Sequence, residues 1–415
     1  MLWVFLAVYA GMLLGGVPGL MLDRTGVALL GATALVALGA LPLSAAWAAI
    51  DAGTLGLLLG LMLLSAQLRL GGFYARATRW IAARPTSPSR LLLELVMLAG
   101  GLSAVLTNDV VCLAIAPVLV DVCRRRDLDP VPFLLGLAAA SNVGSAATLI
   151  GNPQNLLIGE TLQLSFAGYL AVGAPPALLG LLVCHVVLAR AYRGRFARRA
   201  PAPEPPALQA DPPFDRWQTG KGLVLVALLG LGLLAAPIDR AVLALAAGGA
   251  VLLSRRFATR TVLQLVDWPL LLLFAGLFVV HGALDRAGHP AAWLAGAADA
   301  GVDLRHPAAL FGATVLGSNV VSNVPWVMLL LPAATADGAG AVLALASTLA
   351  GNLVLVGSIA NLIVVEQARR LGAVPDRGSW FAAHLRCGLP ITLATLAVAA
   401  LWLWLCARLG LGGAG

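Results

Sequence analysis

Long apolar segments separated by short polar stretches are the main pattern of this chain. A helix needs about 20 apolar residues to cross the hydrocarbon core of a bilayer. Segments of about that length lie at 2–21, 26–44, 53–70, 131–158, 168–189, 222–238, 240–254, 267–284, 341–366 and 388–408. The pattern predicts an all-α, multi-pass protein of the cytoplasmic (inner) membrane with about ten transmembrane helices.

Polar residues interrupt four of the apolar regions. Residues 91–122 are interrupted between Ser103 and Asp109, and residues 307–335 between Ser318 and Asn323. We predict that each is a re-entrant hairpin. The crossings 131–158 and 341–366 contain Gly, Asn, Pro or Ser in the middle, and we predict that both are broken helices. Irregular backbone at membrane depth is tolerated where it is buried in protein or lines a cavity.

Composition supports this class. Of the 415 residues 60% are hydrophobic and 11% charged, whereas a soluble domain carries about 25% charge. This excludes a soluble globular enzyme and a disordered chain. The five cysteines lack metal-ligand spacing, so we expect reduced, packed thiols, although Cys112 near Asn108 is a soft group that could meet trivalent arsenic.

Basic residues predict the orientation, because Lys and Arg collect on the cytoplasmic side. With both termini outside, the residues that fall on the outer side, among 27 Lys and Arg, are Arg240, Arg286, Arg305 and Arg408. The net charge of +8 therefore reflects topology. The basic, Pro-rich stretch 190–221 is predicted to be a cytoplasmic linker that contacts lipid head groups, and no nucleic acid is expected as a partner.

The chain repeats itself. Ser103, Thr107 and Asn108 precede a Pro, and the same pattern returns 215 positions later at Ser318, Ser322 and Asn323. The predicted repeats are 1–189 and 222–415. Because each crosses five times, the second should be inverted, which is typical of secondary transporters.

Each repeat also contains a predicted break, Gly151–Asn155 in the first and Gly357–Asn361 in the second. Half-helix ends there would attract ions. Residues four apart share a helical face, so Ser103 with Thr107, and Ser318 with Ser322, could aim hydroxyls at one point. The predicted substrate and ion site comprises Ser103, Thr107, Asn108, Asp109, Gly151, Asn152, Pro153, Asn155, Ser318, Ser322, Asn323, Pro325, Gly357, Ser358 and Asn361.

Asp109 is the ionisable member of that set, and we predict that it carries the coupling proton or binds a cation. Structural roles are the alternatives. Ser103 and Ser318 could bond back to a carbonyl one turn earlier, and Asp109 could belong to an ion pair. Helix caps are the alternative for Asn108, Asn155, Asn323 and Asn361. Asp51 and Asp267, which precede apolar runs, are predicted N-caps, and Glu160 and Glu366 are expected at the interface.

Four motifs carry a family resemblance: TNDVVCLAIAP, ATLIGNPQNLLIG, SNVPWVMLLLP and GNLVLVGSIANLIVVE. Between Ile50 and Glu366 the chain resembles the ion transporter superfamily, which includes ArsB-type arsenite permeases, NhaD-type sodium/proton antiporters and divalent-anion sodium symporters. The resemblance implies two inverted repeats and a homodimer. The symporters carry Ser-Asn-Thr at both hairpin tips; here Asp109 and Val324-Pro325 depart from it, which favours the arsenite and antiporter branch.

The predicted function is secondary active transport of a small inorganic anion or oxyacid, with efflux of arsenite or antimonite favoured and coupling to protons through Asp109. The alternatives are sodium-coupled uptake of a dicarboxylate or sulfate-like anion, sodium/proton antiport, or a channel. No nucleophile elbow, metal-binding His cluster or nucleotide loop occurs, so we expect neither an enzyme nor a metal or organic cofactor; the coupling ion is H⁺ or Na⁺. The sequence leaves open whether a separate ATPase subunit exists.

Overall fold

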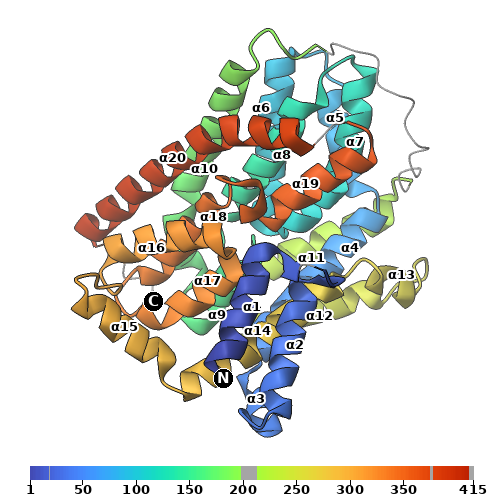
Figure 1. Ribbon diagram of the computed structural model, residues 1–415. Helices are drawn as coiled ribbons and strands as arrows, with labels where there is room; N and C mark the ends of the chain where they lie inside the picture. The colour runs from blue at the N-terminus through green and yellow to red at the C-terminus, as the bar shows by residue number, and fades with distance from the viewer. Residues whose placement is uncertain (18, 198–212, 374–376, 411–415) are drawn as a thin grey trace.

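The computed structural model describes residues 1–17, 19–197, 213–373 and 377–410, and these are almost entirely helical (Figure 1). The first half contains α1 (Leu2–Leu14), α2 (Arg24–Ala37), α3 (Leu43–Ala49), α4 (Ala52–Leu70), α5 (Phe73–Ala82), α6 (Pro88–Val105), α7 (Asn108–Arg125), α8 (Pro130–Ser145), α9 (Pro153–Thr161) and α10 (Phe166–Ala191). Two short antiparallel strands, β1 (Gly16–Val17) and β2 (Leu22–Asp23), join α1 to α2.

The second half repeats this order. It contains α11 (Arg216–Ala235), α12 (Arg240–Leu252), α13 (Thr259–Leu263), α14 (Trp268–Arg286), α15 (His289–Asp299), α16 (Pro307–Val320), α17 (Asn323–Leu330), the 3₁₀ turn η1 (Leu331–Ala333), α18 (Ala339–Ala350), the 3₁₀ turn η2 (Leu355–Gly357), α19 (Ile359–Arg370) and α20 (Arg377–Leu409). Left-handed glycines open the corresponding short helices, Gly72 before α5 and Gly288 before α15. Figure 1 shows α5 near the top of the view and α15 near the bottom.

The prediction of an all-α polytopic membrane protein is confirmed. Among the described residues, six helices are long and apolar enough to cross a bilayer: α4, α6, α10, α11, α14 and α20. The remaining apolar helices are shorter, and two predicted crossings end early. The segment 2–21 leaves the helix after Leu14, because Gly15 adopts a left-handed conformation (φ 77°). The segment 26–44 is divided between α2 and α3.

Local capping explains several helix boundaries. The side chains of Asp51 and Asp267 accept hydrogen bonds from Thr54 N and Leu270 N, so both predicted N-caps are confirmed. Asp215 caps α11 in the same way, and this helix therefore starts inside the stretch that we predicted to be linker. The centre of that stretch, 198–212, lies outside the described residues.

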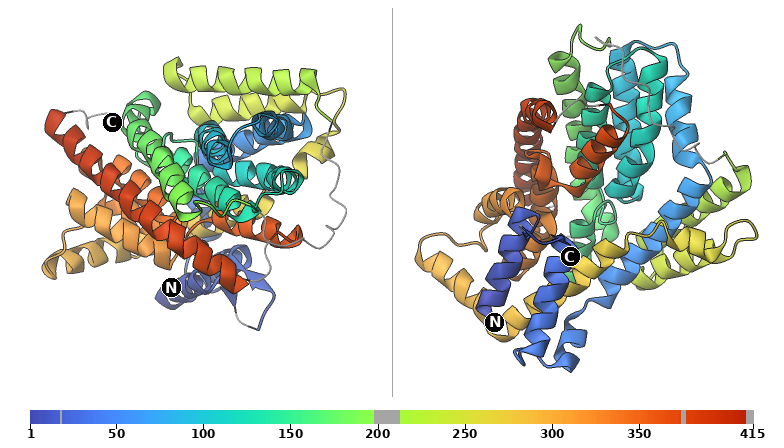
Figure 2. Two further views of the ribbon diagram at one scale, coloured as in Figure 1. Left: turned by 90° about the horizontal axis from the view of Figure 1, so that it is seen from above. Right: turned by 45° about the vertical axis from the view of Figure 1, so that its right-hand side comes forward.

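Close helix crossings hold the two halves together. The backbone of α12 packs so tightly on Gly60 of α4 that a Cβ there would lie 2.3 Å from Ala244 O. The corresponding crossing joins α14 to α2, where a Cβ on Gly276 would lie 2.8 Å from the Ala28 carbonyl carbon. Small residues at such crossings are typical of membrane helix packing. Both turned views show helices of the two halves interleaved (Figure 2).

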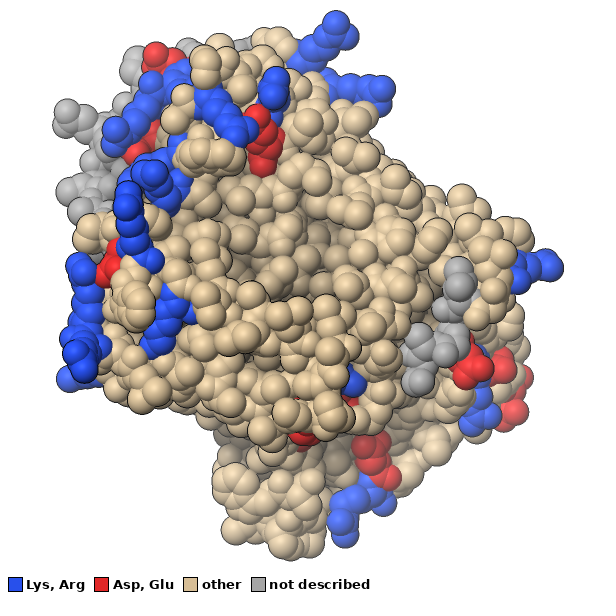
Figure 3. Space-filling model, turned by 180° about the vertical axis from the view of Figure 1, so that it is seen from behind, with Lys and Arg blue, Asp and Glu red and all other residues tan. Residues whose placement is uncertain are grey.

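Charge is distributed as a membrane protein requires. Figure 3 shows Lys and Arg gathered along one edge of the molecule, beside a broad face without charge. In Figure 1 this edge is the right-hand side, with α5 and α7 near the top and α13 lower down. The five cysteines are free and buried, as predicted.

Candidate functional site

The first helical hairpin docks directly onto the first break. Its arms, α6 and α7, are joined at Leu106 and Thr107, and the backbone N–H of Asn108 donates to Gly151 O at 3.0 Å. A Cβ on Gly151 would lie 2.3 Å from Ser145 O, so only glycine fits this position. The glycine predicted from the sequence is therefore required by the close approach of three backbone segments.

Side chains satisfy the backbone of this break. Asn152 caps α9, accepting from the Asn155 N–H at 2.9 Å. The Asn155 amide donates to Thr148 O at 3.0 Å and to Tyr169 Oη at 3.2 Å. Polar backbone groups at membrane depth need partners of this kind.

The second break repeats the arrangement. Ser358 caps α19, accepting from Ala360 N at 3.2 Å, and the Asn361 amide donates to Gly351 O at 2.8 Å. The cap alternative for Asn108, Asn155, Asn323 and Asn361 does not hold, because the helices beside them have other N-cap residues: Thr107, Asn152, Ser322 and Ser358. Asn155 and Asn361 instead bind carbonyls at the ends of α8 and α18 and fix the shape of each break.

Each half completes the break of the other half. On α8, Asn142 Oδ1 accepts from Ser358 Oγ at 2.8 Å, and its amide nitrogen donates to Asn361 Oδ1 at 3.1 Å. The same amide donates to Asn352 Oδ1 at 2.9 Å, and Asn108 Nδ2 donates to Asn142 Oδ1 at 3.1 Å. This side chain, which is buried, joins the first hairpin tip to the second break.

Thr348 on α18 plays the reciprocal role. Its hydroxyl donates to Asn155 Oδ1 at 3.1 Å and accepts from Asn152 Nδ2 at 3.1 Å. Thr348 follows Asn142 by 206 positions, as Asn361 follows Asn155. The breaks themselves have the same offset, since Gly357 follows Gly151 by 206 positions, so the two contacts are equivalent under the internal repeat.

The second hairpin tip is strained. Ser322, between α16 and α17, has φ 114° and ψ 156°, a region that residues other than glycine rarely adopt. Asn323 begins α17 and, with its amide oriented to suit its neighbours, donates to Ser347 O at 3.2 Å and to Gly357 O at 3.3 Å. Its oxygen then accepts from Gln154 Nε2 at 3.2 Å, so this tip binds both breaks.

A small cavity of about 20 Å³ lies where the tips and breaks meet. Its lining consists of Asn108, Asp109, Pro153, Gln154, Ser322, Asn323, Val324, Gly357, Ser358 and Ile359. A space of this size holds about one water-sized group. Asp109 is 8% exposed, and its carboxylate has no hydrogen bond or ion pair within the described chain. The ion-pair alternative for Asp109 is therefore not supported.

The paired hydroxyls predicted at each hairpin do not lie on one helical face. Ser103 and Thr107 do not share a helical face because α6 ends at Val105, and α16 likewise ends at Val320, before Ser322. Within the described residues, the hydroxyls of Ser103, Thr107 and Ser318 are buried without hydrogen-bond partners, so no back-bond occurs at either serine. Pro325 is not part of the cavity lining, and its carbonyl accepts from Tyr9 Oη at 2.7 Å.

Sequence reasoning missed Asn142, Gln154 and Thr348. A signal was present, because residues 140–145 read ASNVGS and residues 346–351 read ASTLAG, each immediately before a break. Polar residues in such apolar helices are expensive and mark a site. Cys112 is fully buried with Sγ 3.0 Å from Ser141 Oγ, and it does not line the cavity.

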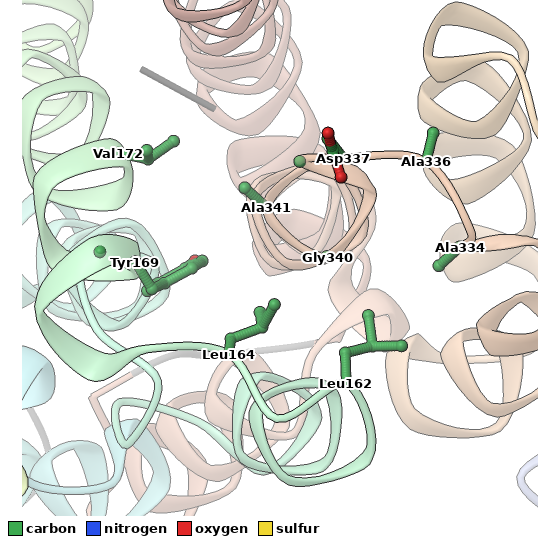
Figure 4. A pocket seen from close by; sticks show the side chains of 11 residues that line it. Leu162, Leu164, Tyr169, Val172, Ala334, Ala336, Asp337, Gly340 and Ala341 are labelled. Carbon is green, nitrogen blue, oxygen red and sulfur yellow. The ribbon is translucent and has the colours of Figure 1, made fainter. Parts of the chain in front are cut away.

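A larger pocket of about 180 Å³ lies elsewhere, between the α9–α10 turn and the start of α18 (Figure 4). Its walls are mainly Leu, Val, Ala and Gly, with Asp337 and Tyr169 as the polar side chains. Tyr169 Oη donates to Ala146 O at 2.9 Å. We take the smaller cavity as the candidate site, because polar side chains from both hairpin tips and both breaks converge on it.

Comparison with known proteins agrees with the fold. Residues 2–350 match the profile of the family described as citrate transporters. The chain belongs to this family. It is therefore a membrane transporter and not an enzyme, and the predicted resemblance to the ion transporter superfamily is confirmed. In such transporters the coupling ion acts as a co-substrate, and no cofactor is involved.

Relatives cover most of the chain. A 46 kDa membrane protein of Mycobacterium leprae is 30% identical over 378 residues, covering 86% of each chain. The silicon efflux transporter LSI3 of Oryza sativa subsp. japonica is 30% identical over 464 residues, covering 92% of each chain. A putative transporter arsB of Dictyostelium discoideum is 23% identical and covers 91% of this chain and 86% of its own.

A solved structure shows the same fold. The YdaH transporter of Alcanivorax borkumensis superimposes with a TM-score of 0.63 at 18% identity, covering 100% of this chain and 98% of that one. That transporter is described as having an unusual topology, and the likeness shows that the two chains share a fold.

Proposed function

We propose that this protein is a proton-coupled secondary transporter that moves a small oxyacid or inorganic anion, of the arsenite or silicic acid type, out of the cell. The observation that carries the proposal is the cavity closed by both hairpin tips and both breaks, with the unpaired Asp109 carboxylate in its wall. An ionisable side chain at membrane depth is by default a candidate for function, and proton relay is one of the roles that such acids have.

The chemistry of the lining supports a small hydroxylated substrate. Apart from Asp109, the polar groups facing the cavity are neutral amides and hydroxyls, which both donate and accept hydrogen bonds. Arsenious and silicic acids carry several hydroxyl groups and are largely uncharged at neutral pH. One relative is named for silicon efflux.

Alternating access would follow from the repeat. The hairpin α6–α7 of the first half and the hairpin α16–α17 of the second half meet at the cavity. In the proposed mechanism the halves are inverted, both hairpins are re-entrant, and the termini lie outside with the basic edge in the cytoplasm. The homodimer implied by the superfamily resemblance belongs to the same proposal.

The test uses purified protein in liposomes that contain a pH-sensitive dye. Arsenite, antimonite, silicic acid, citrate, succinate, sulfate and NaCl are added separately across an imposed proton gradient. We expect a lumenal pH change with the oxyacids, its loss in Asp109→Asn, and its retention in Asp121→Asn. Asp121 is a matched control, because it lies on α7 as well but pairs with Arg125 at 2.9 Å.

The other outcomes contradict the proposal in defined ways. A response to NaCl alone would indicate sodium/proton antiport. Uptake of labelled citrate or sulfate that requires sodium would indicate the symporter alternative. An unchanged oxyacid response in Asp109→Asn would remove this carboxylate from coupling.

A further inference from the structure

A buried histidine is connected to the second hairpin tip through a tyrosine. His281 on α14 and Tyr9 on α1 are each 8% exposed. Tyr9 Oη lies 2.7 Å from His281 Nε2 and 2.7 Å from Pro325 O, at the start of α17. The other ring nitrogen, His281 Nδ1, lies 2.9 Å from Leu277 O. Three hydrogen-bonding contacts thus run from α14 to the tip whose Val324 lines the cavity.

The protonation of His281 decides which of these three contacts can be hydrogen bonds. The carbonyls of Leu277 and Pro325 can only accept, so Nδ1 must carry a hydrogen to bond Leu277. In the neutral imidazole Nε2 is then an acceptor, and it competes with Pro325 O for the single hydroxyl proton of Tyr9. In the imidazolium form Nε2–H donates to Tyr9 Oη, and Tyr9 donates to Pro325. All three contacts are satisfied only when His281 is protonated.

The surroundings of His281 do not supply a competing partner. The elements packed against α14 are α1, α2, α3, α4, α15 and α17. Their titratable and charged residues, with those at the ends of α14, are Tyr9, Arg24, Asp51, Arg69, Asp267, Asp285, Arg286, His289 and Asp299. Of these, Tyr9 alone has a hydrogen bond with His281 in the described structure. The other ring beside it is Phe5, with centroids 6.3 Å apart.

We propose that His281 and Tyr9 form a proton-sensitive latch on the second hairpin: protonation fastens Tyr9 to Pro325, and loss of the proton releases it. The inference rests on the proposed function in assuming that the hairpin moves during transport. The latch acts on one hairpin, since the position corresponding to His281 in the first half is Ser65 on α4. Its hydroxyl is buried without a hydrogen-bond partner in the described chain.

Hydrogen–deuterium exchange of residues 316–330 in lipid nanodiscs tests the latch without any substrate. After correction for the intrinsic pH dependence of exchange, we expect wild-type protection to rise by about threefold to tenfold as pH falls through the titration of His281, the range for one hydrogen bond. Tyr9→Phe and His281→Gln should remove this step. Tyr74→Phe and His185→Gln, in the first half, should retain it.

The outcomes separate the latch from the transport mechanism. A pH step that persists in Tyr9→Phe, or one that is missing in wild type, would overturn the latch. If His281→Gln fails to fold, Tyr9→Phe decides alone, because it removes one hydroxyl and keeps the ring. A step that depends on Tyr9 in a protein that moves no oxyacid would leave the latch standing and reject the proposed function.

Discussion

The two hairpin tips occupy corresponding positions in the repeat, yet they differ in charge, backbone and anchoring. The first tip has relaxed backbone at Thr107 (φ −65°, ψ 132°) and carries Asp109. The second tip has Ser322 at φ 114° and places Val324 and Pro325 where the first has an acid and an apolar residue. The difference suggests a division of roles in which the first tip holds the proton and the second tip moves.

Packing around the second tip fits that role. The indole of Trp326 fills the space beside Gly317, where a Cβ would collide with it, and its Nε1 donates to Ala313 O at 2.8 Å. A residue held in an unfavourable φ/ψ region costs about 1–3 kcal/mol and persists only when its surroundings determine it. The arms of the hairpin and the Tyr9 contact supply that constraint, so the tip is held in a conformation that it would leave on release.

The largest expected effect comes from removing the ionisable group of Asp109. Asp109→Asn should abolish pH-gradient coupling in liposomes while the protein stays folded, because the amide cannot lose a proton. Adding Val324→Asp to this variant places an acid at the matching position of the second tip and should not restore coupling. Restored coupling would show that the tips are interchangeable.

The breaks should differ in their tolerance of a methyl group. Gly151→Ala would place Cβ 2.3 Å from backbone oxygen and should lower the free energy of unfolding by about 3 kcal/mol, whereas Gly357→Ala meets its nearest atom at 3.2 Å and should cost under about 1 kcal/mol. Thermal unfolding in detergent measures both. Gly101→Ala, with open space around it, is the control. Equal losses at both breaks would contradict this difference.

The reciprocal contacts across the halves should also be unequal. Asn142→Ala removes a side chain bonded to four others and should destabilise by about 2–3 kcal/mol, while Thr348→Val keeps the shape and should cost about 1–2 kcal/mol. The same unfolding assay applies. If the double variant lost no more free energy of unfolding than Asn142→Ala alone, the two contacts would not be independent.

The smallest expected effect is a gain in the free energy of unfolding. Ser322→Gly should raise the free energy of unfolding by up to about 1 kcal/mol, because glycine adopts φ 114° without steric strain. Thr107→Gly at the first tip should instead lower it, since the backbone there is relaxed and glycine costs more entropy. A loss of stability in Ser322→Gly would mean that its backbone carries no strain.

The sequence predicted the parts of the fold that depend on local chemistry. Apolar length, the N-caps at Asp51 and Asp267, and helix pairs at 91–122 and 307–335 all follow from neighbouring residues. The re-entrant path of these pairs stays a prediction. Ser103 and Thr107 do not share a helical face, because α6 ends at Val105 and the chain turns before Thr107.

Contacts that depend on tertiary packing were out of reach. Asn142 meets Asn361 from more than 200 positions away, and nothing local indicates which of several buried amides will pair. The positive φ of Ser322 was equally hidden, because serine is a residue type for which relaxed backbone is expected. The repeat itself was the one long-range signal that the sequence carried.

Asn142 and Thr348 each complete the break of the other half, and this limits how the protein can assemble. Neither half contains the groups that complete its own break, so a chain comprising α1–α10 would leave Asn155 without Thr348, and one comprising α11–α20 would leave Asn361 without Asn142. A gene divided between the halves should therefore yield two unstable fragments when each is expressed alone. Co-expression should restore a transporter, and an ancestral half-length chain would have worked only by pairing with a second copy of itself.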